Sequence, residues 1–358
     1  MKNFVPAFFV TLLLVFFPAS TLAQLPTLAP LKHTPAPNPP KDPHKFTFIL
    51  AGDNRPENAM CKDKGKDKSG KEKPCPPTPA VIEIFKQIKK RSPAFVLWTG
   101  DIIAGKDPDT SILDTEYKEF LDVAKTGDAA LFNAPGNHEM NTKNNCPDTQ
   151  TLLPAYLKDT DQKAPYGSFD YGDSHFIALN SDEDTPTTSD PCNCTKFPKP
   201  ASPPGYIGAA QMELLADDLA ANKNKDHIFI FLHRPLEAYK SDDQLCPGNV
   251  SAMQALFQQY PNVSYVVAGH EHMYYNPQAT TDQAKFYDPP PARTDPNSSG
   301  PFYLVSGGAG APLKSFELNG KKTKSFYHYL IFTVDEASVK VEVKKVKVKQ
   351  TTKAEDDK

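Results

Sequence analysis

The sequence predicts an α/β fold in which strands and helices alternate along the chain. Short apolar runs of strand length alternate with segments of helical periodicity, a pattern typical of a mainly parallel sheet with crossover helices. Six of these runs end in a polar cluster. In open α/β sheets, ligands bind beyond the carboxyl ends of the strands, so the six clusters predict one convergent site.

The predicted strands of this first sheet are apolar almost throughout, as expected for strands buried on both faces. They cover residues 46–51, 95–99, 129–135, 175–179, 228–232 and 263–268.

The predicted helices separate these strands. In the first, residues 79–91, the apolar side chains Ala80, Ile84, Phe85 and Ile88 share one face. The others cover residues 111–125, 208–222 and 250–260.

The last part of the chain changes character, because its apolar runs follow one another without helices between them. These runs cover residues 272–276, 301–306, 327–334 and 338–349. We expect them to form a second, more antiparallel sheet packed on the first.

Composition places the chain among ordinary globular proteins. It has 358 residues, of which 39% are apolar and 23% charged. The net charge is -3 and the pI is near 6.3, so there is no global electrostatic case for binding nucleic acid. The length allows one large domain or two of average size.

The first 23 residues resemble a secretory signal peptide. Lys2 precedes an apolar stretch, and small residues end at Ala23, where we expect cleavage. The alternative is an uncleaved anchor helix, but Pro6 and Pro18 bracket the stretch too tightly for the roughly 20 apolar residues of a membrane span. No second apolar span follows, so we predict a secreted or periplasmic protein without a transmembrane segment in the mature chain.

The rest of the chain divides by composition. Residues 24–44 are rich in proline and have no apolar period, which predicts an extended spacer outside the core. Residues 45–349 form the predicted folded domain, and residues 350–358 a polar tail. The sequence indicates no oligomeric state.

Six cysteines follow the predicted signal peptide, and an even count in an exported chain favours disulfides. Cys61 and Cys75 are expected to close a local loop. Cys146 and Cys246 are then expected to pair with one each of Cys192 and Cys194. The alternative, a metal site at Cys192 and Cys194, has too few clustered partners.

Five of the six polar clusters contain metal donors, which are carboxylate, carboxamide and imidazole groups with no thiol among them. The residues are Asp53, Asp101, Asn137, His233, His270 and His272. Such donors suit Mg²⁺, Mn²⁺, Fe, Zn²⁺ or Ni²⁺ and indicate hydrolysis. His175, His227 and His328 match no motif, and we interpret them as structural.

The donors divide between two ions. Asp101 has two carboxylate oxygens and can bridge both ions. Asp53 and His272 would hold the first ion. The second ion would take Asn137, His233 and His270. Two ions about 3.5–4 Å apart can hold a bridging hydroxide and stabilise both oxygens of an in-line displacement. His138, next to Asn137, is placed to protonate the leaving group.

These motifs resemble the calcineurin-like metallophosphoesterase superfamily, which includes purple acid phosphatases, protein phosphatases and phosphodiesterases. The resemblance rests on Gly52-Asp53, Gly100-Asp101, Gly136-Asn137-His138-Glu139, His233 and Gly269-His270-Glu271-His272, in this order. It implies an α/β/β/α sandwich in a single domain, two divalent metal ions and phosphoester hydrolysis.

Two positions depart from the family pattern. Arg55 stands where the first motif usually has a histidine, and a guanidinium has no lone pair to offer a metal. The first ion would then have only three protein ligands. Arg55 would instead bind a substrate phosphate oxygen, and the alternative is a salt bridge to a nearby carboxylate. Ala104 stands where purple acid phosphatases place an iron-binding tyrosine, which disfavours a ferric site.

Two hypotheses follow. The first is an exported, metal-dependent phosphoesterase that acts on a phosphorylated small molecule or another phosphoester. The second is a non-catalytic envelope binding protein that keeps the fold without full metallation, which only Arg55 supports.

Overall fold

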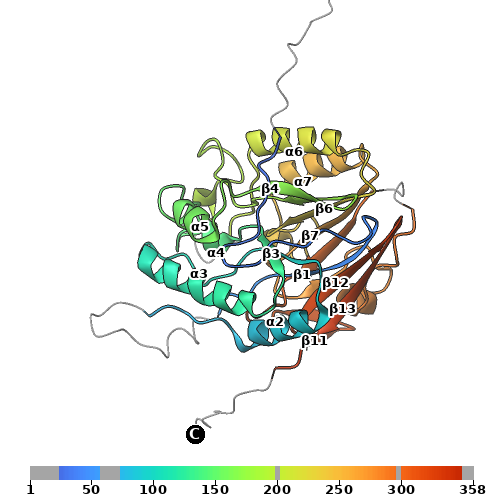
Figure 1. Cartoon of the computed structure of the whole chain (residues 1–358). Helices are drawn as coiled ribbons and strands as arrows, with labels where there is room; N and C mark the ends of the chain where they lie inside the picture. Colours follow the sequence, from blue (N-terminus) through green and yellow to red (C-terminus); the bar gives the residue numbers. More distant parts are fainter. Residues whose placement is uncertain (1–23, 57–72, 198–201, 296–299, 349–358) are drawn as a thin grey trace, which may run out of the picture.

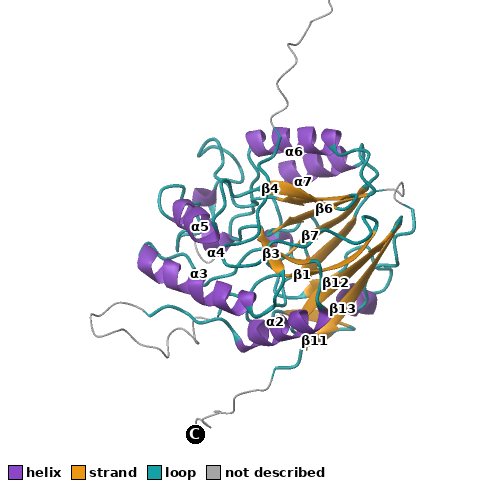
Figure 2. Cartoon of the chain, in the orientation of Figure 1, coloured by secondary structure: helices purple, strands orange, loops and turns teal. Residues whose placement is uncertain are grey.

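The computed structural model describes residues 24–56, 73–197, 202–295 and 300–348. Two β-sheets face each other and helices cover their outer sides, so the domain has the four layers α/β/β/α (Figure 2). The predicted fold class is confirmed.

The first sheet has five strands in the order β13-β12-β1-β2-β3. Its strands are β1 (Lys45–Ala51), β2 (Phe95–Trp98), β3 (Ala130–Asn133), β12 (His328–Asp335) and β13 (Ser338–Lys345). β1, β2 and β3 are parallel, whereas β12 pairs antiparallel with both β1 and β13.

The second sheet has six strands in the order β4-β5-β6-β7-β9-β8. They are β4 (Gly167–Tyr171), β5 (Ser174–Ala178), β6 (His227–Leu232), β7 (Val263–Ala268), β8 (Tyr274–Tyr275) and β9 (Phe302–Ser306). The inner four are parallel, and the two edge strands are antiparallel to their neighbours. A separate hairpin joins β10 (Ser315–Leu318) to β11 (Lys321–Lys324).

The expected division of strands between the sheets is wrong. The six apolar runs do not share one sheet, because β1–β3 lie in the first and β5–β7 in the second. The late strands do not form a sheet of their own, since β12 and β13 extend the first and β9 the second. A doubly buried apolar run identifies a strand but carries no information about its non-local partner.

Helices cover each sheet from outside, in cyan and green on one side and in yellow and orange on the other (Figure 1). The first group is α2 (Pro79–Arg91), α3 (Thr110–Lys125), α4 (Asn137–Met140) and α5 (Leu152–Thr160). The second is α6 (Ala209–Ala221) and α7 (Pro247–Phe257). A short helix, α8 (Asp282–Tyr287), and the 3₁₀ turns η1 (Cys194–Lys196) and η2 (Ser241–Asp243) lie in loops.

Local chemistry fixes the ends of α2 as predicted. The hydroxyl of Thr78 caps the first turn by accepting from the Val81 N–H (3.3 Å), and Pro79 occupies the first position. Ser92 ends the helix in the left-handed conformation, φ 48°. α7, by contrast, begins and ends three residues before its expected bounds, and α5 was missed.

Three apolar cores fill the three gaps between layers. The central core lies between the sheets and is dominated by stacked and edge-on aromatic rings such as Phe48, Phe95, Phe176 and Phe229. One outer core joins the first sheet to α2, α3 and α5, and the other joins the second sheet to α6 and α7.

The proline-rich segment at residues 24–44 is not a spacer outside the core, which corrects the expectation. Leu25, Leu28 and Leu31 are buried, and each enters a different one of the three cores. Leu28 donates its N–H to the carbonyl of Ser168 on β4, and Leu31 donates to Leu131 on β3. The segment therefore runs across the edges of both sheets.

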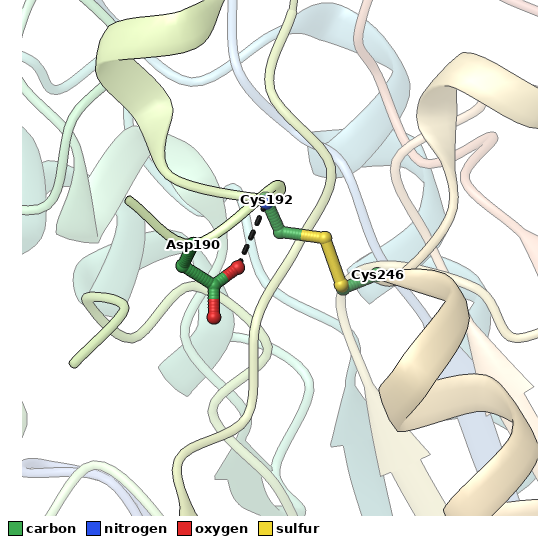
Figure 3. Close-up of side chains that lie close together, drawn as sticks. All are labelled: Asp190, Cys192 and Cys246. Atoms are coloured by element: carbon green, nitrogen blue, oxygen red, sulfur yellow. Dashed lines mark hydrogen bonds between the residues drawn. A yellow bond between two sulfur atoms is a disulfide. The ribbon is translucent and has the colours of Figure 1, made fainter. Parts of the chain in front are cut away.

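Two disulfides between described cysteines join loops of the domain. Cys146 pairs with Cys194, and Cys192 with Cys246, as expected. Figure 3 shows the second pair beside Asp190, whose carboxylate accepts from the Cys192 N–H (2.8 Å). Because Cys192 and Cys194 each form a disulfide with another cysteine, the alternative metal site at these two residues is excluded.

Some predictions lie outside the described residues. They are the signal peptide at 1–23, the polar tail at 350–358, and Cys61 of the expected Cys61–Cys75 pair. Among the described residues, no helix is both long and apolar enough to cross a bilayer.

Candidate metal centre

The six predicted ligands come from the carboxyl ends of strands in both sheets. Asp53 and Asp101 follow β1 and β2, Asn137 begins α4 after β3, His233 follows β6, and His270 and His272 follow β7. All six are buried. The contacts below bring them together in two groups that share Asp101.

The first group contains Asp53, Asp101 and His272. One ligand atom from each lies within 4.8 Å of the others. His272 Nε2 is 3.5 Å from Asp53 Oδ1. Burial, together with the charge of Asp101, raises the pKa of Asp53 well above its usual value. A cation between the two carboxylates would remove this repulsion.

The second group surrounds Nε2 of His233. Asn137 Oδ1 lies 2.9 Å from this nitrogen, His270 Nδ1 lies 3.0 Å away, and Asp101 Oδ1 lies 3.4 Å away. These are the ligands that the sequence predicts for the second ion.

Backbone carbonyls set the tautomers of two of the histidines. His233 donates from Nδ1 to the Thr99 carbonyl (2.8 Å), and His272 donates from Nδ1 to the Pro312 carbonyl (2.9 Å). A neutral ring then has its Nε2 lone pair facing the oxygen of Asn137 or Asp53. Burial lowers the pKa of His272, which keeps that ring neutral. Two acceptors facing each other need a cation between them.

Asp101 gives a further sign that the residues fit metal ions. Its Oδ2 atom is buried and has no hydrogen-bond partner among the described residues, while its Oδ1 accepts from the His138 N–H (3.0 Å). A buried unsatisfied carboxylate oxygen is costly unless it binds a cation. The donor set therefore fits divalent ions on both sides of Asp101.

His270 is held differently. Its Nε2 atom lies 3.2 Å from Nη1 of the buried Arg234 and 3.5 Å from Oδ1 of Asp243. Arg234 can only donate, so in this arrangement Nε2 accepts from it. Ligation through Nδ1 would instead require the proton on Nε2, where Asp243 could accept it. Lys314 pairs with the other oxygen of Asp243 (2.8 Å). Asp243 is thus positioned to orient a predicted ligand.

Four of the six predicted ligands have left-handed backbone conformations. The φ angles are 64° at Asp53, 51° at Asp101, 70° at His270 and 40° at His272. Such conformations cost about 1–3 kcal/mol each outside glycine and cluster at functional sites. Here they turn the side chains of successive loops toward one point.

Glu139 holds two of these loops in place. Its carboxylate accepts from the N–H groups of Asp101 (2.8 Å) and Gly136 (2.7 Å) through Oε2. Through Oε1 it accepts from Ile102 (3.0 Å) and Ile103 (3.2 Å). This one side chain therefore fixes the loop that carries Asp101 against the loop that carries Asn137.

The glycines of the motifs allow the loops to approach one another. Gly100 has φ 87°, and a Cβ placed on it would lie 2.6 Å from the nitrogen of Gly136 and 2.9 Å from His233 Nδ1. A larger residue at this position would push apart the loops that carry the second group of ligands.

His138 and Arg55, the predicted catalytic residues, border the ligands. His138 Nδ1 hydrogen-bonds the carbonyl of Ala104, which leaves Nε2 free. Burial, then the charges of Arg55 and Lys106, lower the pKa of His138. The Arg55 side chain is 28% exposed, and its Nε lies 3.5 Å from Asp101 Oδ2. The salt bridge proposed as the alternative role of Arg55 is therefore within ion-pair distance.

Sequence reasoning missed several residues around the ligands. Glu139 belongs to a motif that predicts no role for it, and no sequence motif predicts a role for Arg234, Asp243 or Lys106. Arg234 follows His233 directly and is 1% exposed, held by Asp182 (2.9 Å). Adjacency to a ligand was the one sequence signal for Arg234, whereas Asp243 and Lys106 lie in loops without a motif.

Comparison with solved structures shows the same fold. A dimetal phosphatase from Danio rerio aligns with a TM-score of 0.56 at 14% identity, over 84% of this chain and 96% of that one. GAP50, the anchor in the inner membrane complex of Plasmodium, aligns with a TM-score of 0.51 at 12% identity, over 86% of this chain and 87% of that one. PhoD aligns with a TM-score of 0.50 at 12% identity, over 86% of this chain and 70% of that one. No curated protein matches the sequence.

Comparison with protein families gives a match to calcineurin-like phosphoesterases over residues 74–274. This range contains every predicted ligand except Asp53, and it also contains His138. The special resemblance to purple acid phosphatases stays a prediction. The chain thus belongs to the calcineurin-like phosphoesterase family, and this membership supports a metal-dependent hydrolase acting on phosphoester bonds.

Proposed function

We propose that this protein is an exported phosphoesterase that uses two divalent metal ions and an in-line displacement at phosphorus. The observation that carries the proposal is the pair of donor groups around Asp101, with an unsatisfied oxygen and histidine lone pairs facing other acceptors. Asp53, Asp101 and His272 would hold one ion, and Asp101, Asn137, His233 and His270 the other. Bound there, the ions would lower the pKa of a water molecule and stabilise charge developing on the phosphate.

Arg55 would bind the substrate phosphate. Its side chain is partly exposed, and its buried Nε has no hydrogen-bond partner in residues 24–56 or the other described ranges. A guanidinium in this state has donors to offer a phosphate oxygen. Binding would also place the positive charge of Arg55 against the negative charge that grows in the displacement.

His138 would protonate the leaving oxygen from Nε2. Its lowered pKa keeps the ring neutral before substrate binds. A bound phosphate dianion would offset the charges of Arg55 and Lys106, which contribute to that lowering, and would favour uptake of a proton by the ring. The hydrogen bond to the Ala104 carbonyl keeps Nε2 pointing away from the loop.

Phosphomonoesters are the substrate class we favour over diesters. The support is the length of the insertions at residues 182–205 and 275–300, which we expect to restrict the cleft. Export is supported by the two disulfides, which are typical of oxidising compartments, and by the pattern of residues 1–23.

A non-catalytic envelope binding protein is the second candidate. The observation that favours it is the Arg55–Asp101 ion pair, because a permanent cation there competes with the first metal ion for Oδ2 of Asp101. Full metallation would then fail, while the fold and the pocket would remain.

The test is hydrolysis of nitrophenyl phosphate and of its bis-ester with Mn²⁺ added, combined with elemental analysis of the purified protein. We expect turnover by the wild type, faster for the monoester. His138→Ala should lower kcat about 10²–10⁴-fold at unchanged metal content. The control is His33→Ala, at an exposed histidine of the N-terminal segment. Absence of turnover with any divalent ion, together with a metal-free protein, would favour the binding protein.

A further inference from the structure

Lys106 is a cation beside the candidate metal centre that the proposed mechanism does not use. It lies in the loop between β2 and α3, and its N–H donates to the carbonyl of His138 (3.0 Å). The preceding Gly105 has φ 57° and packs so closely on His138 that an added Cβ would lie 1.9 Å from the same carbonyl oxygen. This loop is thus fastened to the proposed proton donor.

The ammonium group of Lys106 has no acidic partner within the part of the chain that the structure describes. Its Nζ donates to Oδ1 of Asn145 (2.9 Å), and no carboxylate of the described residues lies within ion-pair distance. Neighbouring lysines differ in this respect: Lys143 pairs with Asp107 (3.3 Å) and Lys314 with Asp243 (2.8 Å). Two of the three ammonium donors of Lys106 therefore remain available.

Asn145 holds this ammonium in a fixed place. It has φ 62° and directly precedes Cys146, whose disulfide to Cys194 ties the loop to a distant part of the chain. A cation kept at one position by a neutral partner is suited to binding an anion, because a carboxylate partner would already have neutralised it.

The charge of Lys106 acts on the site. Burial lowers the pKa of Lys106 to about 8; Asp101 opposes this effect, and Arg234 and Arg55 add to it. The group therefore stays mostly protonated at neutral pH. It also lowers the pKa of His138, so its ammonium and the His138 ring are electrostatic neighbours.

We propose that Lys106 forms a second anion subsite on the leaving-group side of the centre, selecting phosphoesters whose leaving group carries a phosphate or a carboxylate. The inference rests on the proposed function, since it takes His138 to face the leaving oxygen. Arg55 binds the phosphate that is cleaved, and Lys106 binds the anionic group on the part that leaves.

The test compares three substrates with the same three-carbon framework: glycerol 3-phosphate, 3-phosphoglycerate and propane-1,3-diol bisphosphate. The last two add a carboxylate or a phosphate to the leaving group and so distinguish the two anions. We expect the wild type to prefer at least one of them over glycerol 3-phosphate. Lys106→Gln should lower that ratio of kcat/KM values about 10- to 100-fold, as for loss of a charge-assisted hydrogen bond. Lys143→Gln, which removes an already paired lysine, should not change it.

Equal effects of Lys106→Gln on all three substrates would overturn the subsite and leave the phosphoesterase intact. Absence of turnover would count against the phosphoesterase but not against the subsite. In that case the subsite is tested by calorimetry, which measures the binding of ethylphosphonate and 3-phosphonopropionate to the metal-loaded protein. Tighter binding of the carboxylated compound, lost in Lys106→Gln and kept in Lys143→Gln, supports the subsite. Equal affinities in the wild type contradict it.

Discussion

Nε of Arg55 lies 3.5 Å from Oδ2 of Asp101, which places a permanent positive charge next to the carboxylate shared by both groups of candidate ligands. No described residue donates a hydrogen bond to the same oxygen. Arg55 and a metal ion thus compete for one atom. This competition leads to a prediction about metal content.

Arg55→His should raise the metal content of the protein. The substitution removes the competing charge and adds an imidazole lone pair of the kind that the family pattern has at this position. Elemental analysis after dialysis against a fixed Mn²⁺ concentration measures the effect. Arg91→His is the matched control, because Arg91 donates to the hydroxyl of Tyr329 rather than to a candidate ligand. An unchanged metal content in Arg55→His would show that the arginine does not limit metal binding.

Glu139→Gln should destabilise the metal-free protein by about 2–4 kcal/mol. A glutamine has one acceptor oxygen, so two of the four N–H groups that Glu139 binds would lose their partner and face an NH₂ group. Urea unfolding in the presence of a chelator measures the change. Glu342→Gln, at a partly exposed pair with Lys344, should change the stability by less than about 1 kcal/mol.

Replacing Cys146 and Cys194 with serine should lower the free energy of unfolding by about 4 kcal/mol in the chain-entropy model. The reason is that their disulfide closes a loop with a sequence separation of 48. Denaturant midpoints of the double variant and the wild type give the difference. The wild type after full reduction should lose at least as much. A double variant as stable as the wild type would mean that the hydrogen bonds of these loops suffice to hold them.

His328 predicts a loss of stability in acid. Burial lowers its pKa from 6.5 to about 4, and the neutral ring faces the Phe326 carbonyl through Nδ1 and the Ser306 hydroxyl through Nε2. Between these pH values the unfolded chain binds a proton that the folded chain does not, so stability falls as the pH falls through this window. The full effect is about 3 kcal/mol.

His328→Asn should remove this part of the pH dependence, because the asparagine amide can still donate to the Phe326 carbonyl but does not titrate. Unfolding free energies of the metal-free proteins at a series of pH values between 4 and 7 test this prediction. Parallel curves for the two proteins would assign the acid sensitivity to other groups.

The sequence predicted which residues converge better than it predicted the topology of the sheets. Asp53, Asp101 and His272 were recognisable because a polar cluster a few residues beyond a doubly buried strand has few structural reasons to be there. The partner of each strand was not recognisable, since β1 and β12 are paired by contacts between residues almost 300 positions apart, such as Phe48 and Phe332. Nothing local in either segment encodes that register.

Lys106, Asp243 and the three buried leucines could not be recognised from the sequence for a different reason. Lys106 looks like any loop lysine until its lack of a carboxylate partner is known. Asp243 becomes relevant only because the fold brings it to His270. Leu25, Leu28 and Leu31 lie among prolines with no helical or strand period, because each enters a different core and no single face had to be apolar.

Those three leucines have a consequence for how the protein matures. If a peptidase cuts after Ala23, Leu25 becomes the second residue of the new chain. The segment that covers the edge strands β3 and β4 then lies at the new N-terminus. Removal of ten further residues would take one buried leucine from each of the three cores. It would also leave the edge strands β3 and β4 uncovered and prone to self-association. The position of such a cut would therefore decide whether these two strand edges stay covered.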